Sequence, residues 1–566
     1  MKASDCIVKL LEAQHITHVF GYQGGMITYL VDSLSRSNTV KYIQCYHEQS
    51  AAIAAEGYAL ESGNFGVAIS TSGPGATNMI TGIADAYFGS IPVLYITGQV
   101  NTYEYKYDKK IRQLGFQETD IVSIVKPITK YAVMINTPEE LESELKKAIR
   151  IALTGRKGPV LIDIPMNIQR ADINAFDYSF AVEDKLLAVS SEQIKEAEDL
   201  LSKAEKPLVI CGNGIFQSKS KSQVQDFLNE INIPYVVSMV GKSSVNEESD
   251  KFCGVIGSYG NRCANIIFSK ADVVLALGSR LDVRQTGNIN SETLQKIRFI
   301  HVDIDNEELQ NSKLQNALNL HCDLRYFINA IDTKKISINK NWLAYCKSII
   351  SHYSQEKDIQ RFEEIPEPYN AIGKIRECIT EDSVFVTDVG QNQIWAAQIL
   401  KLASNDEYFT SGGLAPMGFA IPCAVGAAFA NPNKKVVCIT GDGGFHFALQ
   451  SLQLISQYHL NVDIYVLNNA SLGLITQFQT LYFKSNMAGT TAEGGYLVPD
   501  IKSIANAYNL KYFFITDISQ LTGTFGKGFI CEIKLPDLTT VVPKLEFNKE
   551  LYNMIPYLPE EEIKKL

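Results

Sequence analysis

Short apolar segments alternate with longer amphipathic ones along the whole chain, and this alternation limits the possible folds more than any other feature. Segments 66–71, 93–97 and 160–164 are five or six residues long and rich in Val, Ile and Leu. Buried strands of this kind, separated by helical segments, are typical of parallel sheets covered by helices on both faces. The sequence therefore predicts an α/β fold of the doubly wound, parallel-sheet type.

The chain is too long for one hydrophobic core. It has 566 residues, and single cores rarely grow that far, so we expect three domains and a short tail. Segments 170–190 and 333–368 are polar or charged, and we interpret them as connectors. The predicted domains are 1–170, 190–332 and 365–540, followed by a tail at 541–566. Further predicted strands are 17–21, 207–211, 273–277, 298–302, 384–387, 436–440, 463–467 and 529–532.

Charge and cysteine usage exclude several functional classes. The net charge is -10 and the pI is about 5.5, which argues against a broad basic surface for nucleic acid. The eleven cysteines include no CxxC pair, so we expect reduced thiols and neither a disulfide framework nor a zinc site. The first 14 residues are amphipathic, and no apolar run approaches the roughly 20 residues that span a bilayer. We therefore expect a cytoplasmic protein with no nucleic-acid or membrane partner.

Two strand ends in the third predicted domain carry the strongest chemical signal. Segment 436–440 runs into Gly-Asp-Gly-Gly, and segment 463–467 runs into Asn-Asn-Ala-Ser. Open α/β sheets bind ligands at the carboxyl ends of their strands. There Asp442, Asn469 and a loop carbonyl, assigned to Ser471, offer the oxygen ligands that Mg²⁺ prefers when it bridges a diphosphate. Glycines let the backbone and a helix N-terminus approach the phosphates closely, and these are Gly441, Gly443 and Gly444.

This pair of motifs matches the thiamine-diphosphate fingerprint, and other segments extend the resemblance over nearly the whole chain. The chain resembles the catalytic subunits of acetolactate synthase, in the superfamily of thiamine-diphosphate-dependent carboligases. The matching segments are FGYQGG (20–25), HEQSAA (47–52), TSGPGATN (71–78), GIADAYFGSIPVLYITGQV (82–100), FQETDIV (116–122), LGSRLDVRQTG (277–287) and SGGLAPMGFAIP (411–422). The resemblance implies a pyrimidine-binding first domain, a central domain that usually carries FAD, and a diphosphate-binding third domain.

The resemblance also assigns roles to individual residues. Glu48 matches the carboxyl group that hydrogen-bonds the cofactor's aminopyrimidine and activates it. Met417 matches the apolar wedge that bends the cofactor, and Phe116 and Gln117 match residues that line the reaction centre. The remaining cofactor-binding positions taken from the resemblance are Gly24, Gly25, Gly75, Gly412 and Leu474. Because the family's active site lies between subunits, a homodimer is the smallest expected unit; a homotetramer and a regulatory subunit are left open.

The central domain carries the flavin-side motif. Arg280 is a candidate contact on the flavin side, and Arg284 matches an arginine that reads the carboxylate of the second keto acid. Asp303 and Asp305 follow a predicted strand, where they either hold a ribose hydroxyl or cap a helix. The family's FAD is largely structural, so the resemblance implies no redox chemistry.

The expected activity is decarboxylation of pyruvate and transfer of the two-carbon unit to a second carbonyl compound, which gives acetolactate. The loops near the active-site entrance, where the second carbonyl compound is expected to bind, depart from the family pattern. Phe478 replaces a tryptophan, Met166 replaces a lysine and Ser258 replaces a methionine. A pyruvate-dependent carboligase that acts on a nucleotide-linked keto-sugar in branched-sugar biosynthesis is therefore a first alternative. A flavoenzyme of the pyruvate-oxidase type is a second. The chain has no adjacent His-His pair, which disfavours simple decarboxylation to an aldehyde.

Overall fold

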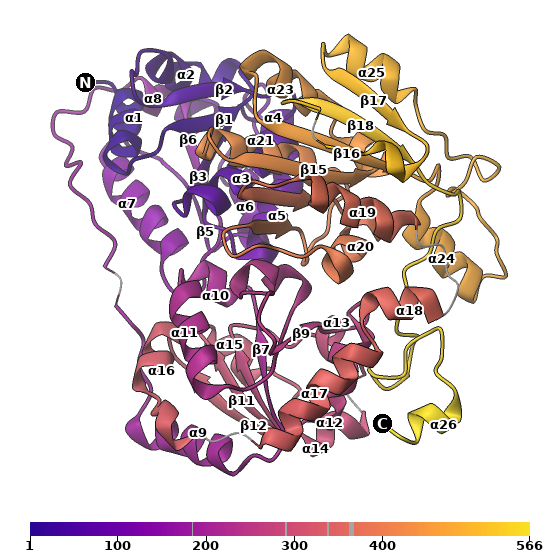
Figure 1. The fold of residues 1–566 in the computed structure, drawn as a ribbon. Helices are drawn as coiled ribbons and strands as arrows, with labels where there is room; N and C mark the ends of the chain where they lie inside the picture. Colours follow the sequence, from indigo (N-terminus) through magenta and orange to yellow (C-terminus); the bar gives the residue numbers. More distant parts are fainter. Residues whose placement is uncertain (184, 289–290, 337–338, 362–366, 524) are drawn as a thin grey trace.

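The computed structural model describes residues 1–566 except 184, 289–290, 337–338, 362–366 and 524. Its described strands form three six-stranded sheets, and every pairing within them is parallel, which confirms the predicted fold class. Parallel pairing follows from the helical crossovers between successive strands. The first and third sheets lie side by side in the upper half of Figure 1, and the second lies below them.

The first sheet has the strand order β2-β1-β3-β4-β6-β5. Its strands are β1 (His18–Gly21), β2 (Lys41–Gln44), β3 (Gly66–Ser70), β4 (Val93–Gln99), β5 (Tyr131–Met134) and β6 (Val160–Pro165). Its principal helices are α1 (Ala3–Ala13), α3 (Glu48–Ser62), α5 (Ile80–Gly89) and α7 (Glu140–Leu153).

The second sheet has the order β12-β11-β10-β7-β8-β9. Its strands are β7 (Pro207–Cys211), β8 (Tyr235–Val237), β9 (Phe252–Val255), β10 (Val273–Leu277), β11 (Arg298–Asp303) and β12 (Ala317–His321). Alternate residues of β7 enter two different cores. Helices α9 (Ser191–Lys203), α11 (Lys221–Ile231) and α16 (Leu324–Ala330) pack on one face, and α12 (Arg262–Lys270) and α17 (Lys340–His352) on the other. This sheet is therefore doubly wound.

The third sheet has the order β14-β13-β15-β16-β18-β17. Its strands are β13 (Ser383–Thr387), β14 (Glu407–Thr410), β15 (Lys435–Gly441), β16 (Val462–Asn468), β17 (Lys511–Ile515) and β18 (Phe529–Lys534). Helices α19 (Glu367–Cys378) and α20 (Gln391–Ile399) pack on one face, whereas α21 (Ala420–Ala430) lies on the other, against α3 of the first sheet. The first and third sheets consequently share one continuous hydrophobic core.

Two segments outside the sheets pack on the second sheet. Helix α17, which we predicted to lie in a connector, buries Trp342, whose indole N–H donates to the Pro207 carbonyl at 2.8 Å. The C-terminal tail crosses the same region. Arg262 is almost fully buried, pairs with Asp358 at 2.8 Å, and donates to the Met554 carbonyl at 3.1 Å. The predicted start of the third domain, residue 365, lies outside the described residues.

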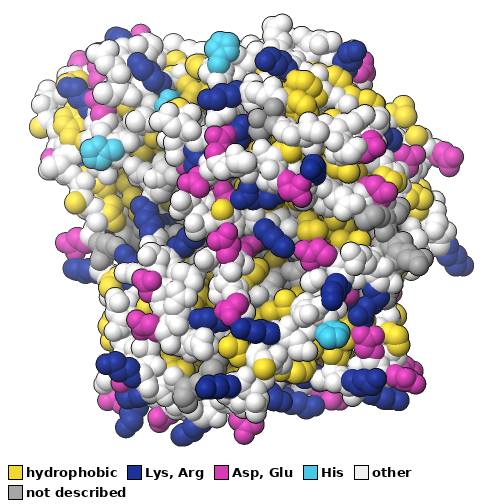
Figure 2. All heavy atoms as spheres, in the orientation of Figure 1, with side chains coloured by type: hydrophobic (Ala, Val, Ile, Leu, Met, Phe, Trp, Pro, Cys, Tyr) yellow, Lys and Arg dark blue, Asp and Glu magenta, His cyan; other side chains and the backbone are white. Residues whose placement is uncertain are grey.

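Basic and acidic side chains are interspersed over the face seen in Figure 2. All eleven cysteines are free thiols. In the part of the chain that the structure describes, no helix combines the length and apolar composition needed to cross a membrane.

Candidate active site

Each sheet contains a central point at which the connections from two neighbouring strands leave in opposite directions. In doubly wound folds such switch points open a crevice beyond the carboxyl ends of the two central strands. The switch points here lie between β1 and β3, between β7 and β10, and between β13 and β15. The loops beyond these strands contain Gly24, Gly25 and Gly75 in the first sheet, Arg280 in the second, and Gly441, Asp442, Gly443 and Gly444 in the third.

At the third switch point, the oxygens of the predicted metal ligands converge. The amide oxygen of Asn469 lies 3.2 Å from Oδ2 of Asp442 and 2.8 Å from the Ser471 carbonyl oxygen. Rotation of the amide would place a donor facing those two oxygens; in the orientation described, the Asn469 oxygen faces both of them and accepts from the Ser471 backbone N–H at 3.3 Å. Ligands about 2.1 Å from one octahedral Mg²⁺ lie at similar mutual distances. The three residues fit a magnesium ion.

The surroundings of Asp442 hold its carboxylate in place. Its Oδ2 accepts from the Asn469 backbone N–H at 3.1 Å, and Oδ1 accepts from the Tyr496 hydroxyl. Burial raises the pKa of the carboxyl group, while these hydrogen bonds act in the opposite direction. A bound cation would offset the cost of burying the charge.

Gly443 and Gly444, beside Asp442, are closely approached by other parts of the chain. A Cβ atom on Gly443 would lie 2.8 Å from Cε of Met417, so this side chain covers the glycine. A Cβ on Gly444 would lie 2.6 Å from Oδ1 of Asp388, which leaves room only for glycine. A Cβ on Gly412 would lie 2.3 Å from a side-chain carbon of Val240, which follows β8 of the second sheet.

Asp388 is a residue of this site that the sequence analysis missed. It is fully buried and accepts from the backbone N–H groups of Gly418 at 2.9 Å and Ala420 at 3.0 Å. Burial raises its pKa to about 6, against these hydrogen bonds. Asp388 therefore fixes the end of the loop that carries Met417. Its position directly after β13, at a switch point, was the available signal.

Glu48 lies at the first switch point, as the first residue of α3. Its side chain is buried, and Oε2 accepts from the Asn78 side-chain amide at 2.9 Å. A Cβ on Gly75 would lie 3.2 Å from Oε1, so the glycine leaves space beside that oxygen. Gly24 is equally restricted, because its Cβ would lie 2.6 Å from Thr71, whereas Gly25 faces open space.

Phe116 and Gln117 lie on a loop near the same switch point. Gln117 has a left-handed backbone, with φ of 64°, and packs against Gly73. Phe116 is 78% exposed, so within one chain it lines no closed cavity. Among the described residues, no hydrogen bond or ion pair joins Glu48 or its neighbour Asn78 to Asp442, Asn469 or Ser471. Among the described residues, these polar contacts thus stay within each half of the predicted site.

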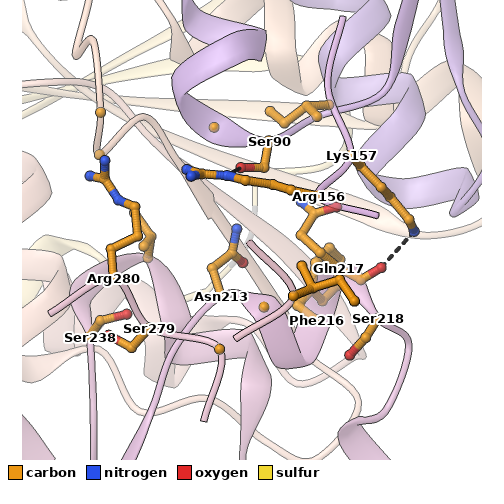
Figure 3. A pocket seen from close by; sticks show the side chains of 18 of the residues that line it. Ser90, Arg156, Lys157, Asn213, Phe216, Gln217, Ser218, Ser238, Ser279 and Arg280 are labelled. Atoms are coloured by element: carbon orange, nitrogen blue, oxygen red, sulfur yellow. Dashed lines mark hydrogen bonds between the residues drawn. The ribbon is translucent and has the colours of Figure 1, made fainter. Parts of the chain in front are cut away.

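A cavity of about 990 Å³ opens at the second switch point. Its lining residues come from all three units of the chain, each unit being one sheet with its helices. Figure 3 shows Arg156 and Arg280 extending into it, with Asn213 between them. Arg280 pairs with Asp282 at 3.1 Å, and Arg156 pairs with Asp305 at 3.0 Å. The third unit contributes Gly412 and Leu474 to the lining.

The structure distinguishes the two roles considered for Asp303 and Asp305. Asp305 caps helix α15 (Asn306–Gln310), accepting from the Glu307 backbone N–H at 3.0 Å. Asp303 lines the cavity, and burial raises its pKa. The Gly-Asn-Gly turn at 212–214 follows β7 and packs against the turn that follows β10. This packing explains the glycine at 212, because a Cβ there would lie 2.2 Å from the Gly278 carbonyl oxygen.

One of the two predicted substrate residues lines the same cavity. Arg284 lines it, with its guanidinium carbon 5.6 Å from the centroid of the Tyr259 ring. Phe478, four residues beyond Leu474 on α24 (Gly473–Tyr482), packs at 4.8 Å from the Tyr482 ring and 6.1 Å from the Phe547 ring. The structure therefore brings Arg284, Leu474 and Phe478 into one region between the second and third units.

Sequence profiles of one family match each of the three units. Residues 1–124 match the thiamine pyrophosphate enzyme N-terminal TPP binding domain, residues 194–331 the central domain, and residues 388–536 the C-terminal TPP binding domain. The first and third matches contain Glu48 and Asp442 respectively.

Curated relatives match over nearly the whole chain. The acetolactate synthase isozyme 2 large subunit of Escherichia coli (strain K12) is 35% identical over 528 residues, covering 92% of this chain and 92% of that protein. The acetolactate synthase large subunit of Cyanidium caldarium is 33% identical, and the match covers 91% of this chain and 89% of that protein. The acetolactate synthase large subunit of Lactococcus lactis subsp. lactis (strain IL1403) is also 33% identical, and the match covers 90% of this chain and 87% of that protein. The chain therefore belongs to the thiamine pyrophosphate enzyme family, and it is a thiamine-diphosphate-dependent enzyme related to the acetolactate synthase large subunits.

Proposed function

We propose that the protein is a carboligase that decarboxylates pyruvate and transfers the two-carbon unit to a second carbonyl compound, with acetolactate as the product when that compound is pyruvate. The observation that carries the proposal is the convergence of Asp442, Asn469 and Ser471 oxygens beside Gly443, in a chain that also buries Glu48 at a second switch point. The first set suits a magnesium-bound diphosphate, and the second suits an aminopyrimidine.

The protein's own part is to bind, orient and exclude water. Bound thiamine diphosphate supplies the carbon nucleophile and the electron sink for loss of CO₂. Asp442, Asn469 and Ser471 would hold its magnesium ion, and Met417 covers Gly443 beside them. Glu48 holds a proton at the pyrimidine ring through the oxygen that faces Gly75, while Asn78 fixes its other oxygen.

We extend the proposal to a homodimer in which each site takes Glu48 from one copy and Asp442 from the other. The absence of a hydrogen bond or ion pair between the two halves among the described residues of one chain supports this. So does the exposure of large apolar side chains on both sides, including Phe116 at 78%, Phe447 at 65% and Leu497 at 74%. The relatives are named large subunits, and on that ground the proposal leaves room for a smaller partner subunit.

FAD is the proposed occupant of the large cavity. Its volume is at the upper end of the range of about 300–1,000 Å³ usual for ligand pockets. Arg156 and Arg280 suit a diphosphate, and Asp303 suits a ribose hydroxyl. The flavin has a structural role in this proposal, so the purified protein should carry yellow absorbance that does not bleach on addition of pyruvate.

Incubation with pyruvate, Mg²⁺ and thiamine diphosphate tests the activity. We expect CO₂ release and accumulation of acetolactate, with no reaction when either cofactor is withheld. Oxygen uptake coupled to pyruvate consumption would instead assign the chain to the pyruvate-oxidase alternative. A product formed only after addition of a nucleotide-linked keto-sugar would assign the acceptor of the other alternative.

A further inference from the structure

Lys544, in the C-terminal tail, is a buried ammonium group at the edge of the predicted acceptor region. Its residue is only 4% exposed. Its Nζ lies 5.9 Å from the centroid of the Tyr259 ring and 5.9 Å from that of Phe478. Cation–π contacts of this kind partly offset the loss of water around a charge.

No carboxylate of the described residues forms an ion pair with Lys544. The acid whose charge acts on it is Glu546, whose carboxylate accepts a hydrogen bond from the Tyr557 hydroxyl. Burial lowers the pKa of the Lys544 ammonium, and the charge of Glu546 only partly opposes this. A charge kept in such a position without a partner carries a desolvation cost that an incoming anion would relieve.

Lys544 and Arg284 are held in one assembly by backbone hydrogen bonds. The Ser258 N–H donates to the Arg284 carbonyl at 2.7 Å, and the Leu545 N–H donates to the Ser258 carbonyl at 2.8 Å. The guanidinium carbon of Arg284 lies 5.6 Å from the centroid of the Tyr259 ring, and Nζ of Lys544 lies 5.9 Å from the same centroid. The two cations can therefore be no farther apart than these two distances added together. Arg284 has no acidic partner among the ion pairs of the described residues, so the region carries two positive charges that form no ion pair there.

We propose that Lys544 is a specificity-determining residue, and that with Arg284 it selects an acceptor ketone that carries two negative charges. This inference rests on the proposed carboligase activity. Arg284 alone satisfies the single carboxylate of a simple 2-keto acid, which leaves Lys544 for a second anionic group. Two kinds of compound share this chemistry: a keto-dicarboxylate, and a ketone attached to a diphosphate.

The test compares matched acceptors on the holoenzyme and its variants. 2-Ketobutyrate carries one charge, 2-ketoglutarate carries two, and a nucleoside-diphosphate-linked keto-sugar presents its charges on phosphates. Lys544→Met should raise KM for the doubly charged acceptors by about 10-fold or more, the loss expected for one charge-assisted contact. It should change KM for 2-ketobutyrate by less than about 2-fold. The acceptor with the lower KM in the unmodified enzyme identifies the source of the second charge.

Two controls separate charge from packing. Lys544→Arg should retain most of the discrimination. Lys549→Met, in the same tail, removes an exposed lysine that lies 5.6 Å from the Tyr557 ring and should change neither KM. An equal rise in KM for singly and doubly charged acceptors in Lys544→Met would show that Lys544 only packs the tail, and no rise at all would also overturn the inference.

Two further measurements keep the inference testable if a variant misfolds or turnover fails. In the unmodified enzyme, added KCl should raise KM for 2-ketoglutarate more steeply than KM for 2-ketobutyrate; parallel curves contradict a second cation. If pyruvate releases no CO₂, the proposed function fails. In that case, calorimetry can still measure the binding of 2-ketoglutarate. The inference predicts that Lys544→Met binds it about 10-fold more weakly than the unmodified protein does.

Discussion

At the scale of single residues, the proposed activity depends most on Glu48. The Glu48→Gln substitution keeps the shape of the side chain and a possible contact with Asn78, but it removes the exchangeable carboxyl proton. Turnover of pyruvate should fall by about 100-fold or more, the range typical of general acid–base groups. Binding of thiamine diphosphate, followed by calorimetry, should change little. Unchanged turnover would refute the role given to Glu48.

Asp163 offers a pH-dependent test at the same scale. It is fully buried on β6, where it accepts from the Thr97 hydroxyl at 2.7 Å and the Gln99 amide at 2.8 Å, and burial raises its pKa to about 7. An unfolded Asp titrates near about 3.9, so between these values the folded chain holds a proton that the unfolded chain releases. Stability from this group is therefore present at low pH and is lost as pH rises to about 7.

The expected signature is a difference in slope. Tm of the unmodified protein should fall between about pH 5 and pH 7.5, and Asp163→Asn should reduce that fall by a few degrees because it cannot titrate. Identical slopes in the two proteins would show that Asp163 titrates normally in the fold.

At the scale of elements, the contact of α3 with α21 joins the first and third sheets. A Cβ on Gly426 would lie 1.8 Å from the Ala54 carbonyl oxygen, and one on Gly57 would lie 2.0 Å from that of Cys423. Gly426→Ala should force the helices apart and destabilise the protein by about 3 kcal/mol or more. Gly373→Ala on α19 meets open space, so it should be neutral or stabilise by up to about 1 kcal/mol. Equal effects in chemical denaturation would contradict this packing.

A comparison of the predicted with the observed strands shows which elements the sequence alone can identify. The strands expected from apolar runs are the central ones, such as β3, β4, β15 and β16, which are almost entirely buried. Seven strands are absent from the prediction: β2, β5, β8, β9, β12, β14 and β17. Six of them are edge strands, and the seventh, β8, is an interior strand of only three residues. Edge strands face solvent, so their residues alternate or mix polarity, as in β17 and β2, and an apolar-run criterion misses them.

The same limit applies to the candidate site. Gly441–Asp442 and Asn469 are recognisable because chemistry restricts residue type at a strand end. Asp388 acts through the backbone N–H groups of Gly418 and Ala420, which leave no pattern in the sequence. Lys544 is 66 residues beyond Phe478, and only the path of the tail brings them together. The site roles remain predictions that the variants above test.

At the scale of the whole molecule, the proposed homodimer makes a specific prediction. Glu48→Gln and Asp442→Asn should each be inactive alone, because each damages every site. In a mixed dimer, one site carries both substitutions and the other carries none. Mixing the two variants under conditions of subunit exchange should therefore restore up to about one quarter of the unmodified activity. Failure to restore activity, with exchange shown by mass spectrometry, would place both residues in the same chain's site.

The central claim is that the enzyme joins two carbonyl carbons after loss of CO₂, and carbon-13 NMR tests it most directly. Pyruvate labelled at its keto carbon should give acetolactate whose two labelled carbons are adjacent and split each other's signals. This should occur only with thiamine diphosphate and Mg²⁺, and not with Glu48→Gln. Labelled acetaldehyde or acetate, with no coupled pair of carbons, would contradict the account.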